Sequence, residues 1–333
     1  MGRMKIDPLL RALADPTRLR IMRLLSAMEL AVGELAQVLG QSQPRVSRHI
    51  RILCDAGLAE RRKEGSWVFL RSAIAENRAP PLGAAAARLL DVAEQDDAAF
   101  SARCAEDRRH LAAIRAGREA TAEAYFARHA GEWDSLRSLH SPDGPVEAAL
   151  AGALGERLGA LLDVGTGTGR MAELFAPRAD HVTALDKSPE MLRIARARLQ
   201  KLPAESVELV QGDFTGLPLP DAAFDTVLFH QVLHYAQEPA SVLAEAARVT
   251  RPGGTIAIVD FAAHDREDLR TQHAHARLGF SDEQMLALLT EAGFAAAPAI
   301  ALPGRPLTVK IWTARRSAAA PSTPVSAGKT TAR

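Results

Sequence analysis

Two kinds of hydrophobic pattern divide this chain of 333 residues. Over residues 15–53, apolar side chains recur every three or four positions, which is the spacing of helices with one buried face. From Val146 onward, short apolar runs alternate with helical patterns, as in a mostly parallel sheet covered by helices. The chain is therefore predicted to be α/β overall, with a mostly helical N-terminal part and a Rossmann-like C-terminal part.

Helix start and stop signals divide the N-terminal part. A first helix is expected after Asp15, which can act as N-cap, with Pro16 in its first turn. A second helix, residues 32–39, is expected to end at Gly40. After a short turn, a third helix begins, for which Ser42 can act as cap.

The third helix, residues 43–53, has an apolar stripe of Val46, Ile50 and Leu53. Its other faces carry the side-chain types that contact phosphates and base edges in a major groove, namely Gln43, Arg45, Ser47, Arg48 and Arg51. Residues 57–70 read as two strands around a charged turn, which adds Arg62 and Lys63 to the predicted DNA contacts. Arginines alone would equally suit a solvated helix face. Helix, turn, helix and basic hairpin together predict a winged helix-turn-helix that binds double-stranded DNA.

The distribution of charge agrees with this interpretation. Residues 1–78 contain 14 Lys and Arg against 8 Asp and Glu, a net charge of +6, whereas the remainder contains 27 against 32, a net charge of −5. The N-terminal part has the sign expected of a polyanion binder, and the rest has the sign of an ordinary enzyme.

Residues 15–70 resemble the ArsR/SmtB family of dimeric bacterial repressors. The segments that carry the resemblance are LADPTRLRIMRLL, GELAQVLGQSQPRVSRHIRILCDAGL and RRKEGSWVFL. The resemblance implies an operator in DNA and a homodimer. Metal-sensing members carry an ELCVCDL motif whose two cysteines bind a soft metal, but this chain has Ala31 and Gly33 at those places. Because soft ions require thiolates, no metal site of this type is predicted.

A helical region follows the hairpin. Residues 82–93 resemble the dimerisation helix of the same family, and residues 105–130 form a long, highly charged helical pattern. This second helix could be a rigid connector or an element that couples two domains, and the sequence does not separate these alternatives. The predicted domains are a winged helix-turn-helix at 1–78, a helical dimerisation and linker region at 79–144, a third domain at 145–316 and a disordered tail at 317–333.

The segment LLDVGTGTGR, residues 161–170, combines an apolar strand, a glycine-rich turn and a helix start. Such turns let the backbone approach a nucleotide closely. A dinucleotide fingerprint is excluded because Arg170 stands where its third glycine would be, and a phosphate-binding P-loop is absent. A second strand ends at Asp186, the position at which an acid binds ribose hydroxyls in this kind of fold. A third strand ends near Asp213.

Residues 154–315 resemble the class I S-adenosylmethionine-dependent methyltransferases. The matching segments are LLDVGTGTGR, VTALDKSPEML, VQGDFTGLPLPDAAFDTV and RVTRPGGTIAIVDF. The resemblance implies S-adenosylmethionine as cofactor, with S-adenosylhomocysteine as product or effector. It implies these cofactor contacts: Gly165, Gly167 and Gly169 at the methionine moiety with Asp163 near its amino group, Asp186 at the ribose, Asp213 at the adenine amino group, and Met191 and Phe214 near the ring.

Methyl transfer from a sulfonium needs positioning and, for some acceptors, a general base. His230 and His234 follow the fourth strand, where either could be that base or could have a structural or cofactor-lining role. The polar segment 264–280 could form a lid over an acceptor pocket. Its His273 and His275 are two positions apart, which disfavours a metal site on one helix face. Arsenic methylation is disfavoured because it uses several thiols and the predicted methyltransferase domain contains no cysteine.

Cys54 and Cys104 are the only cysteines, too few for a disulfide framework. Charges interrupt every apolar run well before it could span a bilayer, so a cytoplasmic protein without a membrane partner is expected. Two functions remain open: a DNA-binding regulator that senses S-adenosylmethionine or S-adenosylhomocysteine, and an active small-molecule methyltransferase whose winged helix serves dimerisation or autoregulation. Methylation of DNA bases is disfavoured because the N/D-P-P-Y/F motif is missing.

Overall fold

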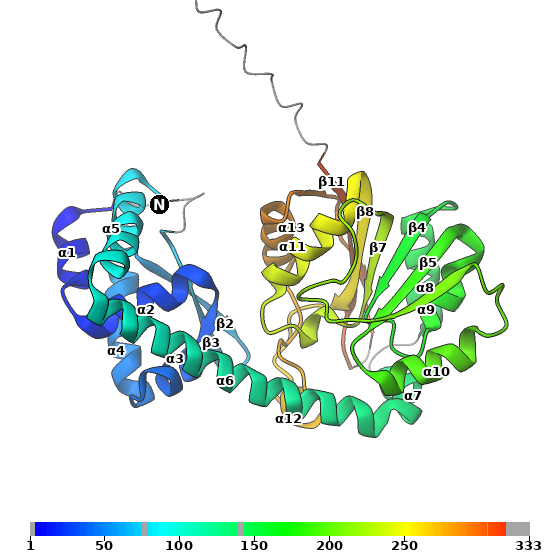
Figure 1. Ribbon diagram of the computed structural model, residues 1–333, viewed down its shortest axis with the longest axis horizontal. Coiled ribbons are helices and arrows are strands. Elements are labelled where there is room, and N and C mark those ends of the chain that lie inside the picture. The colour runs from blue at the N-terminus through cyan, green and yellow to red at the C-terminus, as the bar shows by residue number, and fades with distance from the viewer. Residues whose placement is uncertain (1–3, 75–78, 139–142, 305, 318–333) are drawn as a thin grey trace, which may run out of the picture. The chain divides into compact units, whose positions relative to one another are not determined.

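The computed structural model describes residues 4–74, 79–138, 143–304 and 306–317 (Figure 1). Its internal contacts form two compact units. The N-terminal unit comprises Met1–His129 together with the segments His234–Glu238 and Ala263–Gly279. The sheet unit comprises Ala130–Leu233, Pro239–Ala262 and Phe280–Arg333. Each unit is described separately below.

The N-terminal unit is mostly helical, as the apolar spacing predicts. Its helices are α1 (Ile6–Leu13), α2 (Pro16–Ala27), α3 (Val32–Leu39), α4 (Gln43–Asp55), α5 (Pro81–Asp96), α6 (Ala98–His129) and α12 (Asp268–Gln272). A small antiparallel sheet has the order β1-β3-β2, from β1 (Leu30–Ala31), β2 (Ala59–Glu64) and β3 (Trp67–Ser72). The apolar faces of the helices share one core, in which Ile21, Leu35 and Val46 are fully buried.

The predicted helix boundaries in this unit are confirmed, with one correction. The Oδ1 atom of Asp15 accepts a hydrogen bond of 3.0 Å from the N–H of Arg18, which caps α2. Gly40 ends α3 in the left-handed region, at φ 62°. Ser42 precedes α4 in extended conformation, but its side chain makes no capping hydrogen bond, contrary to the expectation.

The predicted hairpin is also confirmed. Strands β2 and β3 pair antiparallel up to Glu64 and Trp67, so that Gly65 and Ser66 make a two-residue turn between them. Gly65 has a φ of 56°, as tight hairpin turns require. Strand β1, which the sequence did not indicate, pairs Leu30 with Leu70 on the other edge of β3. Its two residues are too few to carry a periodic signal.

The sheet unit contains a mostly parallel sheet, which confirms the predicted α/β fold class. Five parallel strands have the order β8-β7-β4-β5-β6, and β11 pairs antiparallel with β8. Their bounds are β4 (Gly159–Val164), β5 (Ala179–Asp186), β6 (Val207–Gln211), β7 (Phe224–His230), β8 (Thr250–Phe261) and β11 (Val309–Arg316). The short strands β9 (Phe294–Ala296) and β10 (Ile300–Leu302) pair with β11 and were not predicted.

Helices pack against this sheet (Figure 1). Helices α9 (Arg170–Phe175) and α10 (Pro189–Leu199) contact β5, whereas α11 (Pro239–Val249) contacts β8 and α13 (Asp282–Glu291). Helices α7 (Trp133–Ser138) and α8 (Asp143–Leu154) precede the sheet, and the short 3-10 helices are η1 (Ala130–Glu132), η2 (Ala176–Arg178) and η3 (Leu233–Tyr235). The central strands are almost fully buried, as expected of parallel strands covered on both faces.

Two turn-like segments of the sheet unit lie inside regular elements. Residues 251–255, which include two adjacent glycines, lie inside β8, where the pairing with β7 shifts between Thr250 and Thr255 and Gly253 has a φ of 78°. Residues 143–145, at the predicted start of the third domain, lie inside α8, which begins at Asp143. The tail predicted to be disordered lies outside the described residues except for Ser317. Among the helices that the structure describes, none is long and apolar enough to cross a membrane.

Candidate cofactor site and DNA-binding face

The glycine-rich turn connects the carboxyl end of β4 to α9. Gly165 and Gly169 have φ values of 68° and 81°. A Cβ atom at Gly165 would lie 2.4 Å from Cγ2 of Val232, and one at Gly169 would lie 3.0 Å from Cβ of Ala195. Both positions therefore require glycine, for backbone conformation and for space. Val232 and Ala195 thus pack closely against the turn, and they restrict the path of its backbone.

Two of the predicted cofactor-binding acids are anchored to this turn. Oγ1 of Thr166 donates a hydrogen bond of 2.6 Å to Oδ2 of the buried Asp163. The N–H of Gly167 donates one of 2.8 Å to Oδ2 of Asp186, and the N–H of Ser188 donates one of 2.9 Å to Oδ1. Strands β4 and β5 are parallel neighbours, so their carboxyl ends bring the two acids to one edge of the sheet.

Asp186 has an unusual electrostatic environment. Burial raises the pKa of its carboxyl group, and the backbone hydrogen bonds from Ser188 and Gly167 only partly offset that effect. An acid at a strand end with a raised pKa and partial exposure is a typical feature of a ligand site. Its carboxylate oxygens are suited to accept hydrogen bonds from two adjacent hydroxyl groups.

Asp213 lies just after β6 and is already engaged. Its Oδ1 atom accepts hydrogen bonds from the N–H and Oγ1 of Thr215, and Lys187 Nζ lies 3.0 Å from its Oδ2. Burial tends to raise the pKa of Asp213, but these hydrogen bonds and the Lys187 ammonium outweigh burial and lower it. Asp213 is therefore ionised, and its predicted contact with an adenine amino group stays a prediction.

The two predicted ring neighbours differ in exposure. Met191 is 2 % exposed within the first turn of α10, where its N–H donates to Oγ of Ser188. Phe214 is half-buried just beyond β6. Their roles beside a cofactor ring also remain predictions.

The two candidate catalytic histidines belong to different compact units. His230 is the last residue of β7, one position after Phe229, which pairs with Val164 at the end of β4. His234 instead belongs to the N-terminal unit, where its ring centroid lies 4.2 Å from that of His275. Its carbonyl oxygen accepts hydrogen bonds from the N–H groups of Ala276 and Arg277. Of the two, His230 is the one whose strand ends beside the glycine turn.

Helix α4 presents the predicted DNA-reading face. Val46, Ile50 and Leu53 are buried in the core, as predicted. The predicted contacts on this helix are all exposed, namely Gln43, Arg45, Ser47, Arg48 and Arg51. An exposed helix face with three arginines is compatible with insertion into a major groove.

The two predicted wing contacts differ. Lys63 is exposed on β2. Arg62 is held by two carboxylates, with Nη2 lying 3.0 Å from Oε2 of Glu29 and Nη1 lying 2.8 Å from Oε2 of Glu64. Burial alone would lower the pKa of Arg62, but its hydrogen bond and charge interaction with Glu29 raise it. The guanidinium charge is thus neutralised within the protein, and the predicted DNA contact of Arg62 stays a prediction.

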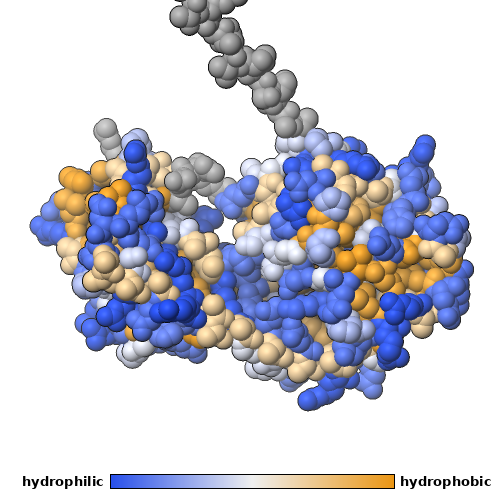
Figure 2. Space-filling view, viewed as in Figure 1, coloured by the Kyte–Doolittle hydropathy of each residue, from blue (hydrophilic) through white to orange (hydrophobic). Residues whose placement is uncertain are grey.

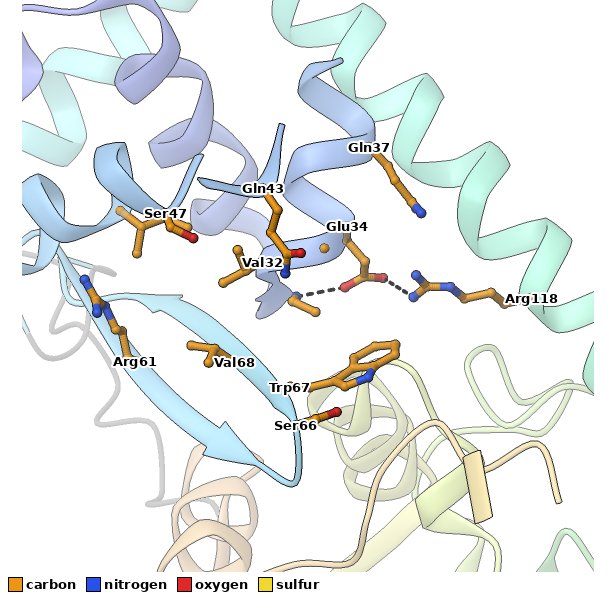
Figure 3. Close-up of a pocket in the computed structure, with 13 residues that line it drawn as sticks. Val32, Glu34, Gln37, Gln43, Ser47, Arg61, Ser66, Trp67, Val68 and Arg118 are labelled. Carbon is orange, nitrogen blue, oxygen red and sulfur yellow. Dashed lines mark hydrogen bonds and ion pairs between the residues drawn. The ribbon is translucent and has the colours of Figure 1, made fainter. Parts of the chain in front are cut away.

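A groove of about 460 Å³ lies between α3, α4, the hairpin and α6 (Figure 3). Ala31 and Gly33, which stand in place of the family's cysteines, are among its lining residues. The carboxylate of Glu34, which also lines the groove, accepts hydrogen bonds from the N–H of Ala31 and from Nη1 of Arg118. Among the described residues, no group of His, Cys, Asp and Glu side chains has an arrangement that could hold a metal ion.

Sequence reasoning missed the role of segment 263–279. The sequence suggested that residues 264–280 could form a lid, but the contacts of 263–279 belong to the N-terminal unit, where Arg277 is 1 % exposed. Oε2 of Glu29 lies 2.9 Å from Nη1 of Arg277 although the two residues are 248 positions apart. No local pattern indicates such a pair, and a mostly polar segment without apolar periodicity reads as a loop.

Comparison with known proteins supports the two types of domain that the sequence predicts. Residues 15–61 match a family model described as "Bacterial regulatory protein, arsR family", and residues 162–258 match one described as "Methyltransferase domain". The chain contains an ArsR-family helix-turn-helix domain and a methyltransferase domain. Both resemblances in the sequence are thereby confirmed, and so is the predicted cofactor class, S-adenosylmethionine, for the second domain.

Relatives match the methyltransferase part. A malonyl-[acyl-carrier protein] O-methyltransferase from Serratia marcescens is 36% identical over 145 residues, which is 43% of this chain and 54% of that protein. A phosphatidylethanolamine N-methyltransferase from Cereibacter sphaeroides is 41% identical over 114 residues, which is 34% of this chain and 56% of that protein. The chain thus spans little more than half the length of these relatives. A solved methyltransferase structure from Mesorhizobium loti is 21% identical, with a TM-score of 0.45 over 52% of this chain and 99% of that chain.

The residues present fit S-adenosylmethionine. The glycine turn permits close approach of a ligand to the backbone, and the half-buried Asp186 stands at the next strand end, where ribose hydroxyls bind in this class of fold. Asp163 and Asp213 are the predicted partners of the cofactor's amino groups, and their carboxylates already accept hydrogen bonds from Thr166 and Thr215. When bound, the cofactor supplies an activated methyl group.

Proposed function

We propose that the protein is a dimeric regulator of transcription that binds an operator in double-stranded DNA, with S-adenosylmethionine or S-adenosylhomocysteine as its effector. One observation carries the proposal: Ala31 and Gly33 remove the thiols of the family's metal site, while the same chain contains a second domain with a cofactor site. A regulator without its usual input needs another ligand site, and the methyltransferase domain provides one.

Modest coupling between the sites is enough for this function. An effector that changes the affinity for DNA by 5- to 150-fold corresponds to a coupling free energy of about 1–3 kcal/mol. The exposed basic face of α4 supplies DNA contacts, and the acids at the ends of β4, β5 and β6 supply ligand contacts. The small-molecule effector and the DNA therefore bind at different places in the chain, as regulation requires.

A DNA-binding titration tests the proposal. The full-length protein is titrated onto labelled DNA from the region upstream of its own gene, at one fixed salt concentration because phosphate contacts make affinity salt-dependent. The titration is repeated with saturating S-adenosylmethionine and with saturating S-adenosylhomocysteine. We expect at least one of the two to change the dissociation constant fivefold or more; equal constants in all three titrations would rule out the effector role.

The proposed homodimer is supported by apolar side chains that are exposed on the surface of the N-terminal unit. On α1, Ile6 and Leu10 are each 53 % exposed, and on α5, Leu89 and Val92 are 55 % and 50 % exposed. Figure 2 shows apolar surface over this part of the molecule. Large apolar side chains gathered on two helices are typical of an interface between subunits. We place the two-fold contact on α1 and α5, in agreement with the resemblance of residues 82–93 to a dimerisation helix.

A catalytically active small-molecule methyltransferase is the second candidate function. It is favoured by the position of His230 at the end of β7, beside the strand that leads into the glycine turn. There His230 would accept a proton from an acceptor group held in line with the methyl group. His234 is less suited, because its contacts lie in the N-terminal unit.

Turnover can be tested without knowing the acceptor. The protein is incubated with S-adenosylmethionine labelled in its methyl group and with fractionated metabolite extracts. Label should appear in a small molecule, and Asp186→Ala should abolish the transfer because it removes the predicted ribose contact. Absence of label in every fraction would count against catalysis and would leave the effector role intact.

A further inference from the structure

The hairpin of the winged helix is held by a segment that is distant in sequence. Segment 263–279 connects β8 to α13, yet its contacts belong to the N-terminal unit. At the hairpin turn, Oε1 of Glu267 accepts a hydrogen bond of 2.6 Å from the N–H of Ser66. The N–H of Leu278 donates one of 2.8 Å to Oε1 of Glu64, at the end of β2. The segment therefore fixes the tip of the wing through its backbone and its side chains.

A buried group of charges lies behind these contacts. We call it the wing cluster, and it consists of Glu29, Arg62, Glu64, Arg270 and Arg277. Nη2 of Arg270 lies 2.7 Å from Oε1 of Glu64, and Nη1 of Arg277 lies 2.9 Å from Oε2 of Glu29 and 3.9 Å from Oε2 of Glu64. Arg62 binds both glutamates from the wing side. Two arginines of the segment thus share their carboxylate partners with Arg62 of the wing.

The same arginines also cover the aromatic residues of β3. The guanidinium carbon of Arg277 lies 4.2 Å from the ring centroid of Phe69, and that of Arg270 lies 4.4 Å from the ring centroid of Trp67. Cations stacked on aromatic faces are stabilised further when they are desolvated. The segment therefore contacts the wing through ion pairs at Glu64 and through cation–π contacts at Trp67 and Phe69.

Burial makes this group sensitive to the loss of any partner. The side chains of Arg277, Glu64 and Arg270 are 2 %, 4 % and 7 % exposed. Burial tends to raise the pKa of Glu64 and of Glu29, but Arg277 and Arg62 outweigh burial and lower both. A buried charge that loses its partner is strongly unfavourable, so the wing and the segment are held in one arrangement or released together.

We propose that Arg277 is a positioning residue for DNA binding, through which segment 263–279 sets the position of the wing. This inference rests on the proposed effector function, and it states how the effector influences DNA binding, namely through segment 263–279 and the hairpin. The segment begins two residues after the end of β8, and β8 pairs with β7 beside the strand that carries the cofactor turn. A ligand that displaces the carboxyl end of β8 also displaces the segment, because the two are adjacent in the chain. The wing cluster then carries this displacement to the hairpin.

The test compares the effector dependence of DNA binding in wild type and in Arg277→Met. Methionine fills similar space without charge, and Arg62 and Arg270 remain to pair with the glutamates. For each protein, the ratio of DNA dissociation constants with and without S-adenosylhomocysteine is measured at fixed salt. We expect a ratio of at least fivefold in wild type and within about twofold of unity in the variant, with affinity for S-adenosylhomocysteine unchanged. A merely structural role would weaken DNA binding equally with and without the effector and would leave the ratio intact.

Arg266→Ala is the matched control, because Arg266 belongs to the same segment but is exposed and pairs with Asp268 outside the wing cluster. It should keep the wild-type ratio. If wild type has a ratio of one with S-adenosylmethionine as well as with S-adenosylhomocysteine, the effector function and this inference both fail. If wild type has the expected ratio and Arg277→Met keeps it, only the inference fails.

A measurement on the wild-type protein does not depend on whether the variant folds. Amide hydrogen exchange of the full chain is followed in hairpin residues 59–72 with and without S-adenosylhomocysteine. We expect the effector to change protection at Ser66 and along β2. Unchanged exchange throughout the hairpin, together with a wild-type effector ratio above fivefold, would overturn the proposed route.

Discussion

The N–H of Gly167 donates a hydrogen bond of 2.8 Å to Oδ2 of Asp186. This bond joins the middle of the glycine turn after β4 to the acid at the end of β5, so the two predicted parts of the cofactor site form one structure. It also means that the carboxylate of Asp186 holds the turn in place, in addition to its predicted contact with the ribose. Changes at Asp186 should therefore alter the turn as well as the affinity for the cofactor.

The raised pKa of Asp186 makes cofactor affinity depend on pH. For an acid with a raised pKa, protonation begins at a higher pH than the ordinary value of about 3.9. The ionised carboxylate is the better acceptor for ribose hydroxyls, so affinity for S-adenosylmethionine should fall as pH decreases while pH is still above 3.9. Isothermal titration calorimetry over a pH series measures this.

Asp186→Asn provides the control for that series, because an amide does not titrate. Its affinity should be lower at neutral pH by roughly 10- to 100-fold, the loss of charged hydrogen bonds of about 1.5–3 kcal/mol, and should vary little with pH. Asp180→Ala removes an exposed acid from the same strand and should behave like wild type. An equal pH dependence in Asp186→Asn and wild type would show that another group is responsible.

Gly165→Ala should damage the cofactor site by steric conflict. The new Cβ would meet Cγ2 of Val232 at 2.4 Å, in addition to the strain of a φ of 68°. The expected destabilisation is roughly 1–2 kcal/mol from the left-handed conformation and a further 1–3 kcal/mol from overpacking, with loss of cofactor binding. Thermal unfolding and calorimetry measure both effects.

Gly253→Ala separates the two causes, because Gly253 has a φ of 78° but nothing within 4 Å of an added Cβ. It should lose stability from backbone strain alone and should keep cofactor binding. The double variant Gly165→Ala/Val232→Ala should recover part of the lost stability. No difference between Gly165→Ala and Gly253→Ala would contradict the close approach.

Arg45→Ala should weaken DNA binding without affecting the cofactor. The side chain is exposed on α4, and loss of one contact to DNA costs roughly 1–3 kcal/mol if it reads a base. Fluorescence anisotropy with operator DNA measures the loss, and calorimetry with S-adenosylmethionine checks the second site. Arg157→Ala, an exposed arginine of the sheet unit, is the control and should leave DNA affinity unchanged. Parallel losses of DNA and cofactor affinity would contradict two separate sites.

Leu89→Glu should convert the proposed dimer into a monomer. Leu89 is 55 % exposed on α5, and a charge there would be buried without a partner in a two-fold interface. Light scattering coupled to size exclusion should give twice the chain mass of 35.7 kDa for wild type and the single mass for the variant. Leu286→Glu changes a leucine of similar exposure on α13 and should remain dimeric. A monomeric wild type would refute the dimer itself.

Most of the fold could be predicted because its signals are local. Apolar spacing, Asp15 before Pro16 and Gly40 after α3 each act within one turn of helix, and they located α2, α3 and α4. Strands β4 to β7 follow from short apolar runs between turns. The sequence did not indicate β9 and β10, because three residues are too few for a periodic pattern. It also did not indicate the first part of β8, because Gly253 and Gly254 read as a turn although they lie where the strand pairing is irregular.

For the candidate sites, the sequence alone determined which residue types stand at the ends of strands and on the open face of the recognition helix. Gly165, Asp186 and Arg45 were recognisable because each depends on its own short segment. Tertiary structure alone decided that Arg62 is neutralised by Glu29 and Glu64, that His234 belongs with His275, and that Arg277 packs behind the wing. Those partners are brought together by chain folding over as many as 248 positions, and burial, which gives their charges their strength, is a property of the packed core rather than of any segment.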